Sequence, residues 1–303
     1  MASCGRQSNI ENLIASIKEE QLCHWVELFS GLRHGQRERE ILEQKGLLLK
    51  EQLEAMGLEV ELDSFRYRQK VYFNVVATLS GQDASLPPYL TGAHYDASLG
   101  SPGADDNASG VAALLAIARV LSQSRPRRTL RFVGFNLEEP QHSFDARYRH
   151  GSRHFSRKAR FRGDRYDGVF ILESIGYTNI RPGSQKIPIR LNFRVPDAGI
   201  FIGMAGNRRA RGIMKHFEET AKRYVPSLPV ISYEVAFRGW ILPMSRMSDN
   251  APFWDWGYPA VMLTDTAFLR NPHYHQTTDL PNTLDLKFLA NVAKALAATL
   301  ASG

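Results

Sequence analysis

The sequence has few of the residues that mark disulfide-rich, thiolate-metal or membrane-spanning proteins. Only two of its 303 residues are cysteines, Cys4 and Cys23, and neither has a neighbouring cysteine or histidine at zinc-binding spacing. We expect both thiols to be reduced and uninvolved in chemistry. No apolar run reaches the ~18 to 20 residues that a membrane span needs, and the first residues contain no apolar signal-peptide core. We therefore expect no membrane partner and a cytoplasmic chain, or a secreted one if a leader has been removed.

Signatures of nucleic-acid binding are also missing, although positive charge is in excess. The formal net charge is +7, and basic residues are concentrated in residues 125–128 and 147–165. No DNA- or RNA-binding module accompanies them, so we interpret them as a scattered, solvated basic surface and expect no nucleic-acid partner. Contact with an acidic substrate is the second interpretation of residues 147–165.

The patterns that are present indicate an α/β fold. A hydrophobic content of 43% and a charged content of 23% fit one large globular domain over residues 1–303. Strand-like runs are predicted at residues 58–65, 72–79, 88–93, 128–135, 167–173, 199–205, 228–235 and 258–265. Helical spacing is found in residues 9–56, 110–121, 208–224 and 286–300, with short helices at 152–158 and 246–256. We expect the helices within residues 1–57 to pack on the core, and residues 141–150 and 181–196 to be irregular.

Side chains that can bind metals gather at the ends of the predicted strands and in nearby loops. They are His94 with Asp96, Asp105 with Asp106, Glu138 with Glu139, Glu173, and His273 with His275. Open α/β sheets place their ligand crevices at the carboxyl ends of strands. Carboxylates with imidazoles suit zinc, and the absence of nearby thiolates favours a catalytic over a structural site. Because one zinc ion takes about three protein ligands, the surplus predicts two ions that share a bridging carboxylate.

Each of these groups also has an ordinary structural interpretation. A lone histidine after a strand is more often a loop residue than a ligand, and residues 105–107 could cap the helix that follows, with Asp106 bonding a helix N–H. Glu138 and Glu139 before a proline are typical of a solvated turn. Glu173 is different, because a carboxylate that ends a buried apolar run needs a partner. The ordinary interpretations would all have to hold at once, so we favour the metal site.

Five segments, in this order, resemble the co-catalytic di-zinc aminopeptidase family. They are residues 94–96, 103–110, 137–139, 172–177 and 272–279. That family includes secreted bacterial leucyl aminopeptidases, glutamate carboxypeptidases and glutaminyl cyclases, and the resemblance runs from about Asn74 to the C-terminus. It implies a three-layer α/β/α sandwich around a mixed, mostly parallel twisted sheet, and a peptide or amino-acid-amide substrate.

The resemblance also implies a role for each residue of the site. The implied metal ligands are His94 and Glu173 on one zinc, Glu139 and His275 on the other, and Asp106 as the bridge between the two ions. Asp96 would orient the imidazole of His94. Glu138 would be the general base that serves a water made acidic by the two cations. Asp105 is then a loop neighbour, and His273 is the alternative to His275.

Two departures from the family pattern bear on the choice of activity. Family members commonly have Ser-Asp-His where this chain has Ser248-Asp249-Asn250, which puts in doubt any role of that histidine but no metal ligand. Glutaminyl cyclases typically have a tryptophan before the last histidine and lack the Asp-Asn-Ala-Ser-Gly run. This chain has Tyr274 there and keeps residues 106–110.

We therefore rank three hypotheses. A zinc-dependent exopeptidase, and an aminopeptidase first among these, is the leading one. A mono-zinc glutaminyl cyclase-like acyltransferase is the second. A non-catalytic interaction domain is last, because such relatives lose ligands, whereas this chain keeps all five together with the base. Residues 141–150, 237–247 and 268–271 are the expected pocket walls, and the sequence indicates no oligomeric state.

Overall fold

The computed structural model of the chain describes residues 2–143, 145, 148–187 and 195–303, with side chains from residue 9 onward. The predictions for residues 141–150, 147–165 and 181–196 therefore lie partly outside the described residues. The side chain of Cys4 lies outside them as well.

One sheet of eight strands forms the centre of the molecule, in the order β1-β2-β4-β3-β5-β8-β6-β7. The strands are β1 (Glu59–Tyr67), β2 (Lys70–Leu79), β3 (Tyr89–His94), β4 (Leu130–Phe135), β5 (Gly168–Glu173), β6 (Ile202–Asn207), β7 (Val230–Val235) and β8 (Ala260–Thr264). The four central strands β4, β3, β5 and β8 run parallel to one another. Antiparallel pairs join β1 to β2, β2 to β4, and β6 to β8. Every predicted strand is present, so the mixed, mostly parallel sheet is confirmed.

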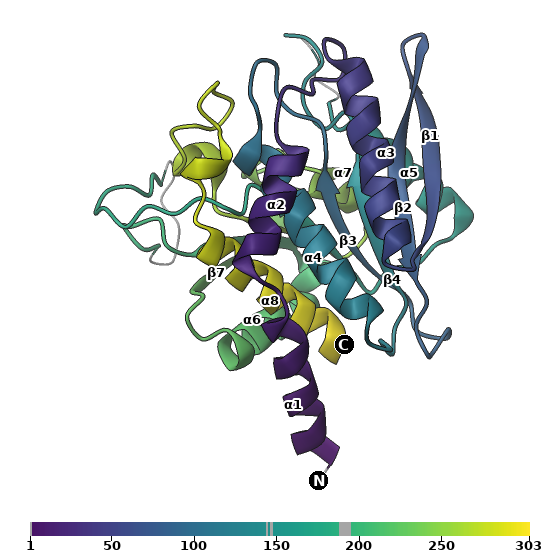
Figure 1. Ribbon diagram of the computed structural model, residues 1–303, viewed down its shortest axis with the longest axis vertical. Helices are drawn as coiled ribbons and strands as arrows, with labels where there is room; N and C mark the ends of the chain where they lie inside the picture. The colour runs from purple at the N-terminus through teal and green to yellow at the C-terminus, as the bar shows by residue number, and fades with distance from the viewer. Residues whose placement is uncertain (1, 144, 146–147, 188–194) are drawn as a thin grey trace.

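Helices cover both faces of this sheet, which confirms the three-layer arrangement (Figure 1). One face carries α1 (Ala2–Ala15), α2 (Glu19–Phe29), α3 (Arg39–Ala55), α4 (Gly110–Ser122), α6 (Arg211–Tyr224) and α8 (Leu286–Ser302). The other face carries α5 (His150–Arg162) and α7 (Asn250–Asp255), whose Phe155 and Phe253 pack together. Helix α5 is longer than the predicted 152–158. It ends at Arg162 and is followed by Gly163, whose φ of +77° suits the left-handed turn that closes a helix.

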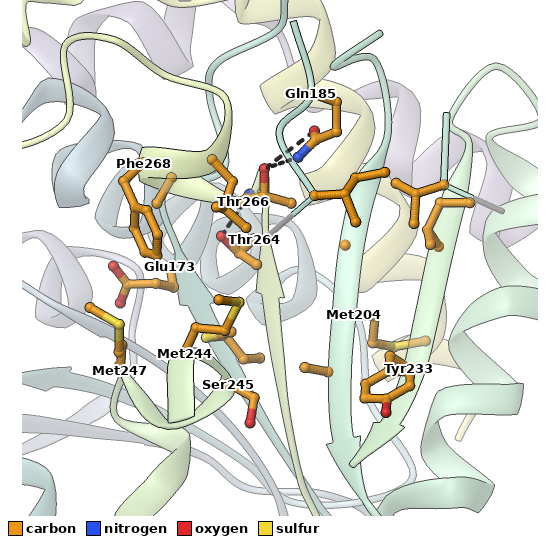
Figure 2. Close-up of a pocket in the computed structure, with 18 of the residues that line it drawn as sticks. Glu173, Gln185, Met204, Tyr233, Met244, Ser245, Met247, Thr264, Thr266 and Phe268 are labelled. Atoms are coloured by element: carbon orange, nitrogen blue, oxygen red, sulfur yellow. Dashed lines mark hydrogen bonds between the residues drawn. The ribbon is translucent and has the colours of Figure 1, made fainter. Parts of the chain in front are cut away.

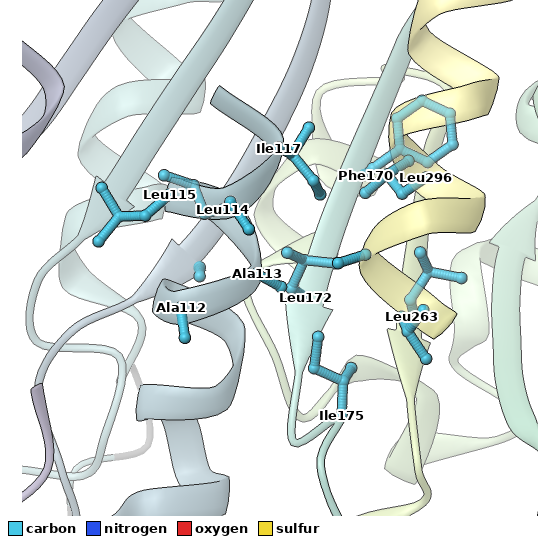
Figure 3. Close-up of a cluster of buried hydrophobic side chains, with 14 of the residues drawn as sticks. Ala112, Ala113, Leu114, Leu115, Ile117, Phe170, Leu172, Ile175, Leu263 and Leu296 are labelled. Carbon is cyan, nitrogen blue, oxygen red and sulfur yellow. The ribbon is translucent and has the colours of Figure 1, made fainter. Parts of the chain in front are cut away.

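Helix α4 is almost completely buried. Figure 3 shows Ala112, Leu114, Leu115 and Ile117, which are among its buried side chains. Helix α4 contacts β3, β5, α2 and α8. Burying a leucine or isoleucine side chain contributes about 1.5–3 kcal/mol. This helix therefore gives firm support to the loop that precedes it, which carries Asp105 and Asp106.

Within the described residues, no helix combines the length and the apolar character that crossing a bilayer requires.

The buried carboxylate of Asp63 ties the edge of the sheet to α5. It accepts a hydrogen bond from Asn74 at 3.2 Å, contacts Lys158, and lies 3.4 Å from His154 Nε2. Burial alone would raise the pKa of Asp63, but hydrogen bonds from His154, Lys158 and Asn74 outweigh it and lower the pKa to about 2. The carboxylate therefore stabilises the fold above the unfolded-state pKa, and that contribution is lost as the pH falls toward 2.

We predict that Asp63→Asn lowers the free energy of unfolding at pH 7 by roughly 1 to 2 kcal/mol, a value reduced because Lys158 and His154 are partly solvated. The difference from the wild type should shrink as the pH falls from about 4 to about 2. Urea unfolding of chelator-treated protein at several pH values measures it. A difference that stays constant over this range would contradict the assignment.

Candidate metal centre

The predicted ligands come together at the carboxyl edge of three neighbouring parallel strands. His94 is the last residue of β3, Glu173 is the last residue of β5, and Glu138 and Glu139 follow β4 by a few residues. Because β4, β3 and β5 are adjacent and parallel, their ends lie side by side. Asp106 enters from the turn before α4, and His275 from the loop after β8.

Two groups of three side chains share Asp106. In the first, His94 Nε2 lies 3.1 Å from Asp106 Oδ1 and 3.5 Å from Glu173 Oε2. In the second, His275 Nε2 lies 3.0 Å from Asp106 Oδ2 and 3.1 Å from Glu139 Oε1. In each group the three candidate ligand atoms lie within 4.8 Å of one another. Asp106 thus offers one oxygen to each group.

These spacings and the unpaired atoms fit a pair of metal ions. Tetrahedral zinc with bonds of about 2.0–2.1 Å separates its ligand atoms by about 3.3 Å, which is close to the distances above. Five of these ligand atoms are buried and have no hydrogen-bond partner among the described residues: His94 Nε2, both oxygens of Asp106, Glu139 Oε1 and His275 Nε2. An unpartnered buried polar atom costs about 1–3 kcal/mol. A bound cation would remove that cost.

The site contains more buried carboxylates than positively charged groups, so a bound cation would stabilise their charged forms. Burial raises the pKa of Glu139 to about 7, and the charge of Asp106 acts in the same direction. Burial would lower the pKa of His275, but Glu139 and Asp106 outweigh it and raise that pKa to about 11. Burial likewise raises the pKa of Glu138 well above its usual range. Carboxylates thus outnumber cations in the cluster, as expected for residues that share divalent metals.

Asp96 holds the backbone of the two adjacent glutamates. Its carboxylate accepts hydrogen bonds from the N–H groups of Glu138 at 3.0 Å and Glu139 at 3.1 Å. Its distance to His94 Nδ1 is 3.5 Å, which is longer than these contacts. Asp96 therefore links the loop after β3 to the loop after β4, in addition to the role toward His94 that the family resemblance implies.

Several supporting residues were not predicted from the sequence. Asp279 accepts hydrogen bonds from the N–H groups of Asp105 and Asp106 at 2.9 and 3.2 Å. Ser248 donates to Glu173 Oε2 at 2.5 Å. Asp279 lies within the motif 272–279, which was the available signal, but no spacing rule pairs residues so far apart in the chain.

Asp105 and Asp106, in the turn before α4, have different surroundings. The prediction that Asp106 bonds a helix N–H is wrong, because both of its oxygens point into the site without a hydrogen bond. No side chain caps α4. Asp105 lies outside both ligand groups, and its carboxylate accepts hydrogen bonds from Gly176 N at 2.8 Å and Asn271 Nδ2 at 2.7 Å. Asp105 therefore joins the turn before α4, which carries Asp106, to the loops that follow β5 and β8.

His273, the alternative to His275, lies outside both groups of the described residues. Its Nδ1 lies 2.9 Å from Thr278 Oγ1, and its ring packs edge-on against Tyr177. The ring of Tyr274 instead stacks on His275 at 3.9 Å. The geometry therefore favours His275 over His273 as a ligand.

An apolar pocket opens beside Glu173 and Tyr274 (Figure 2). It encloses about 1020 Å³, including the space that is open to solvent at its mouth. Its walls are mainly apolar. They include four methionines, Met204, Met244, Met247 and Met262, together with Phe201, Leu242, Phe268 and Leu269. The predicted walls 237–247 and 268–271 thus contribute in part. Trp240 and Ile241 are exposed and do not line this pocket, and neither do the described residues of 141–150.

The fold and the two groups of candidate ligands indicate a metal-dependent enzyme, and comparison with known proteins gives the family. Residues 74–300 match the model of peptidase family M28, so the chain belongs to that family and to its metal-dependent peptidases. It is 33% identical over 230 residues to the uncharacterized protein YfbL of Escherichia coli. The matched region covers 73% of this chain and 68% of YfbL. It is 28% identical over 254 residues to a probable zinc metalloprotease of Leptosphaeria maculans. That match covers 75% of this chain but only 56% of the relative's own length.

Solved structures show the same fold at lower identity. The LapA aminopeptidase of Legionella pneumophila has a TM-score of 0.71 and 20% identity, and the match covers 98% of this chain and 75% of that one. The glutaminyl cyclase of Macrostomum lignano has a TM-score of 0.74 and 16% identity, and the match covers 96% and 91%. Proteins named as an aminopeptidase and as a glutaminyl cyclase thus share this fold, so the fold does not distinguish the two catalytic hypotheses.

Proposed function

We propose that the chain is a di-zinc aminopeptidase whose ions are held by His94, Glu173, Glu139, His275 and the shared Asp106. The observation that carries the proposal is the position of Asp106, with one oxygen toward each histidine. A mono-zinc site needs only three of these five side chains. The burial of all three carboxylates would be costly without a second cation.

The chain's own residues can carry out hydrolysis at this site. Zinc bound here supplies Lewis acidity, which polarises a carbonyl and acidifies water. Glu138 is the general base, because its Oε1 is buried, unpartnered and beside the ligands, while Asp96 fixes its backbone. Glu138 takes a proton from water as the oxygen adds to the peptide carbonyl carbon. It then gives the proton to the departing amine as the C–N bond breaks.

The charge of the site favours the amino end of a substrate. Glu138 and the nearby Asp249 are buried there and are not among the proposed zinc ligands, so a positively charged α-ammonium is favoured over a carboxylate. The neighbouring pocket is apolar and suits a large apolar side chain on the N-terminal residue. We therefore propose peptides and amino-acid amides with such a residue as the substrates.

A substrate panel tests this function. Zinc-loaded protein is incubated with arylamides of leucine, methionine, alanine and glutamate, with N-acetylated versions, and with a C-terminal probe. Zinc-dependent turnover of the leucine and methionine arylamides, abolished by acetylation, is expected. Turnover of only the C-terminal probe, or cyclisation of N-terminal glutamine, would replace the aminopeptidase proposal.

We predict that Met244→Asp lowers kcat/KM for leucine arylamide by about 10- to 100-fold, because it places a charge in the wall that receives the side chain. Ile241→Asp is the matched control, since Ile241 belongs to the same segment but is exposed and outside the pocket. The zinc content of both variants should equal that of the wild type. Equal kcat/KM values for the two variants would rule out this pocket as the side-chain site.

A further inference from the structure

The segment that joins α2 to α3, residues 30–38, contacts two of the loops that carry metal ligands. Gly31 N donates to Pro102 O at 2.8 Å, in the loop after β3. Gln36 Nε2 donates to Gln141 O at 2.8 Å, in the loop after β4. This connecting segment lies outside residues 74–300, which match the family model. The N-terminal helices are therefore joined directly to the metal centre.

Arg33 adds four hydrogen bonds to these contacts. Its guanidinium is buried and donates to the carbonyls of Tyr95 at 2.9 Å, Pro102 at 2.5 Å and Gly103 at 2.8 Å, and within its own segment to Gly31 at 2.9 Å. Tyr95 directly follows the ligand His94, and Gly103 lies three residues before the ligand Asp106. One side chain thus fixes both ends of the loop that connects two proposed ligands.

The guanidinium of Arg33 also carries a buried positive charge close to the carboxylates of the site. Burial lowers the pKa of its guanidinium to about 10, while the carboxylates of Asp96, Asp106 and Asp279 act in the opposite direction. The group therefore stays protonated at neutral pH. Since its donors are taken by carbonyls, its positive charge acts on these carboxylates as a whole and reduces their mutual repulsion.

The neighbouring residues hold the second loop. His34 Nδ1 accepts from Arg37 N at 3.4 Å, which leaves Nε2 as the donor to Pro140 O at 3.3 Å. A Cβ placed on Gly35 would clash with the side chains of Leu137 and Gln141, so the segment packs tightly on the residues that flank Glu138 and Glu139.

We propose that Arg33 is a positioning residue of the metal centre, which holds residues 95–103 so that His94 and Asp106 are set for metal before the metal binds. The inference rests on the proposed zinc ligands. It goes further by placing a determinant of metal affinity in the N-terminal segment. A neutral side chain at position 33 would leave the carbonyl of Tyr95 without its donor and would remove one of the two donors to the carbonyls of Pro102 and Gly103. It would also leave the carboxylates without this charge.

The test compares zinc affinity, measured by competition with a chromophoric chelator, in the wild type, Arg33→Met and Arg33→Lys. Arg119→Met is the matched control, because Arg119 also joins the core to the N-terminal helices, through Ser16 O at 3.1 Å and Gln21 at 3.2 Å, but contacts no ligand loop. We expect Arg33→Met to weaken zinc binding by about 10- to 100-fold. Arg33→Lys should fall between this variant and the wild type, since it keeps the charge but not the planar fork. Arg119→Met should stay within about 2-fold of the wild type while its midpoint of thermal unfolding falls.

Each outcome decides the matter. Equal zinc affinity in Arg33→Met and the wild type overturns the positioning role, and so does an equal loss of affinity in Arg119→Met. If Arg33→Met does not fold, Arg33→Lys carries the test, and wild-type affinity in that variant overturns the proposal. A wild-type chain that binds no zinc refutes the proposed ligands themselves and is thereby distinguished from a failure at Arg33.

Discussion

Replacing Glu138 with glutamine is expected to lower kcat by about 10²–10⁴-fold, the range associated with loss of a general base. Glutamine has nearly the same shape but cannot accept the proton from water or return it to the amine. Because Glu138 lies outside both ligand groups, the zinc content should equal that of the wild type. Its backbone bond to Asp96 does not involve the side chain and should persist. Steady-state kinetics on leucine arylamide, with metal analysis of the same sample, measures both quantities.

Glu61→Gln is the control for this experiment, since Glu61 is an exposed residue of β1. Its kcat should match that of the wild type. A Glu138→Gln variant that keeps more than about a tenth of the wild-type kcat would remove Glu138 from the role of base. A variant that loses zinc along with its activity would instead make Glu138 a metal ligand.

Replacing Asp106 with asparagine is expected to abolish tight binding of the pair of ions and to lower kcat/KM by on the order of 10³-fold or more. Asp106 contributes an oxygen to each ligand group, so its loss affects both ions at once. His94→Ala and His275→Ala each disturb one group only and should each retain about one zinc per chain. Elemental analysis after dialysis gives the counts.

Asp105→Asn separates the two adjacent aspartates. Asp105 bonds the backbone of Gly176 and the side chain of Asn271 and lies outside both ligand groups. Its replacement should lower the midpoint of thermal unfolding and leave two zinc ions per chain. If Asp105→Asn loses zinc and Asp106→Asn keeps it, the assignment of the bridge is reversed.

Much of the site could be predicted because its residues are attached to recognisable strands. His94 and Glu173 directly end apolar runs, and Glu138 and Glu139 follow another, so the parallel order of the sheet was enough to bring them together. The single-domain organisation stays a prediction.

The remaining contacts depend on positions that are distant in the sequence. The bonds of Asp279 to the backbone of Asp105 and Asp106, and of Arg33 to Gly103, join segments 70 to 174 residues apart. No local periodicity encodes such pairs. The helix-cap prediction for Asp106 failed for a related reason, because local propensity indicated an N–H partner where the fold turns the carboxylate toward two histidines.

Zinc per chain is the measurement that tests the account most directly. The wild-type protein is loaded with zinc, dialysed, and analysed for metal and protein in the same sample. Two ions per chain are predicted, because the five proposed ligands form two groups that share Asp106. One ion per chain, together with cyclisation of N-terminal glutamine, would favour the mono-zinc acyltransferase. No bound zinc would contradict the metal centre and leave the non-catalytic interaction domain as the remaining hypothesis.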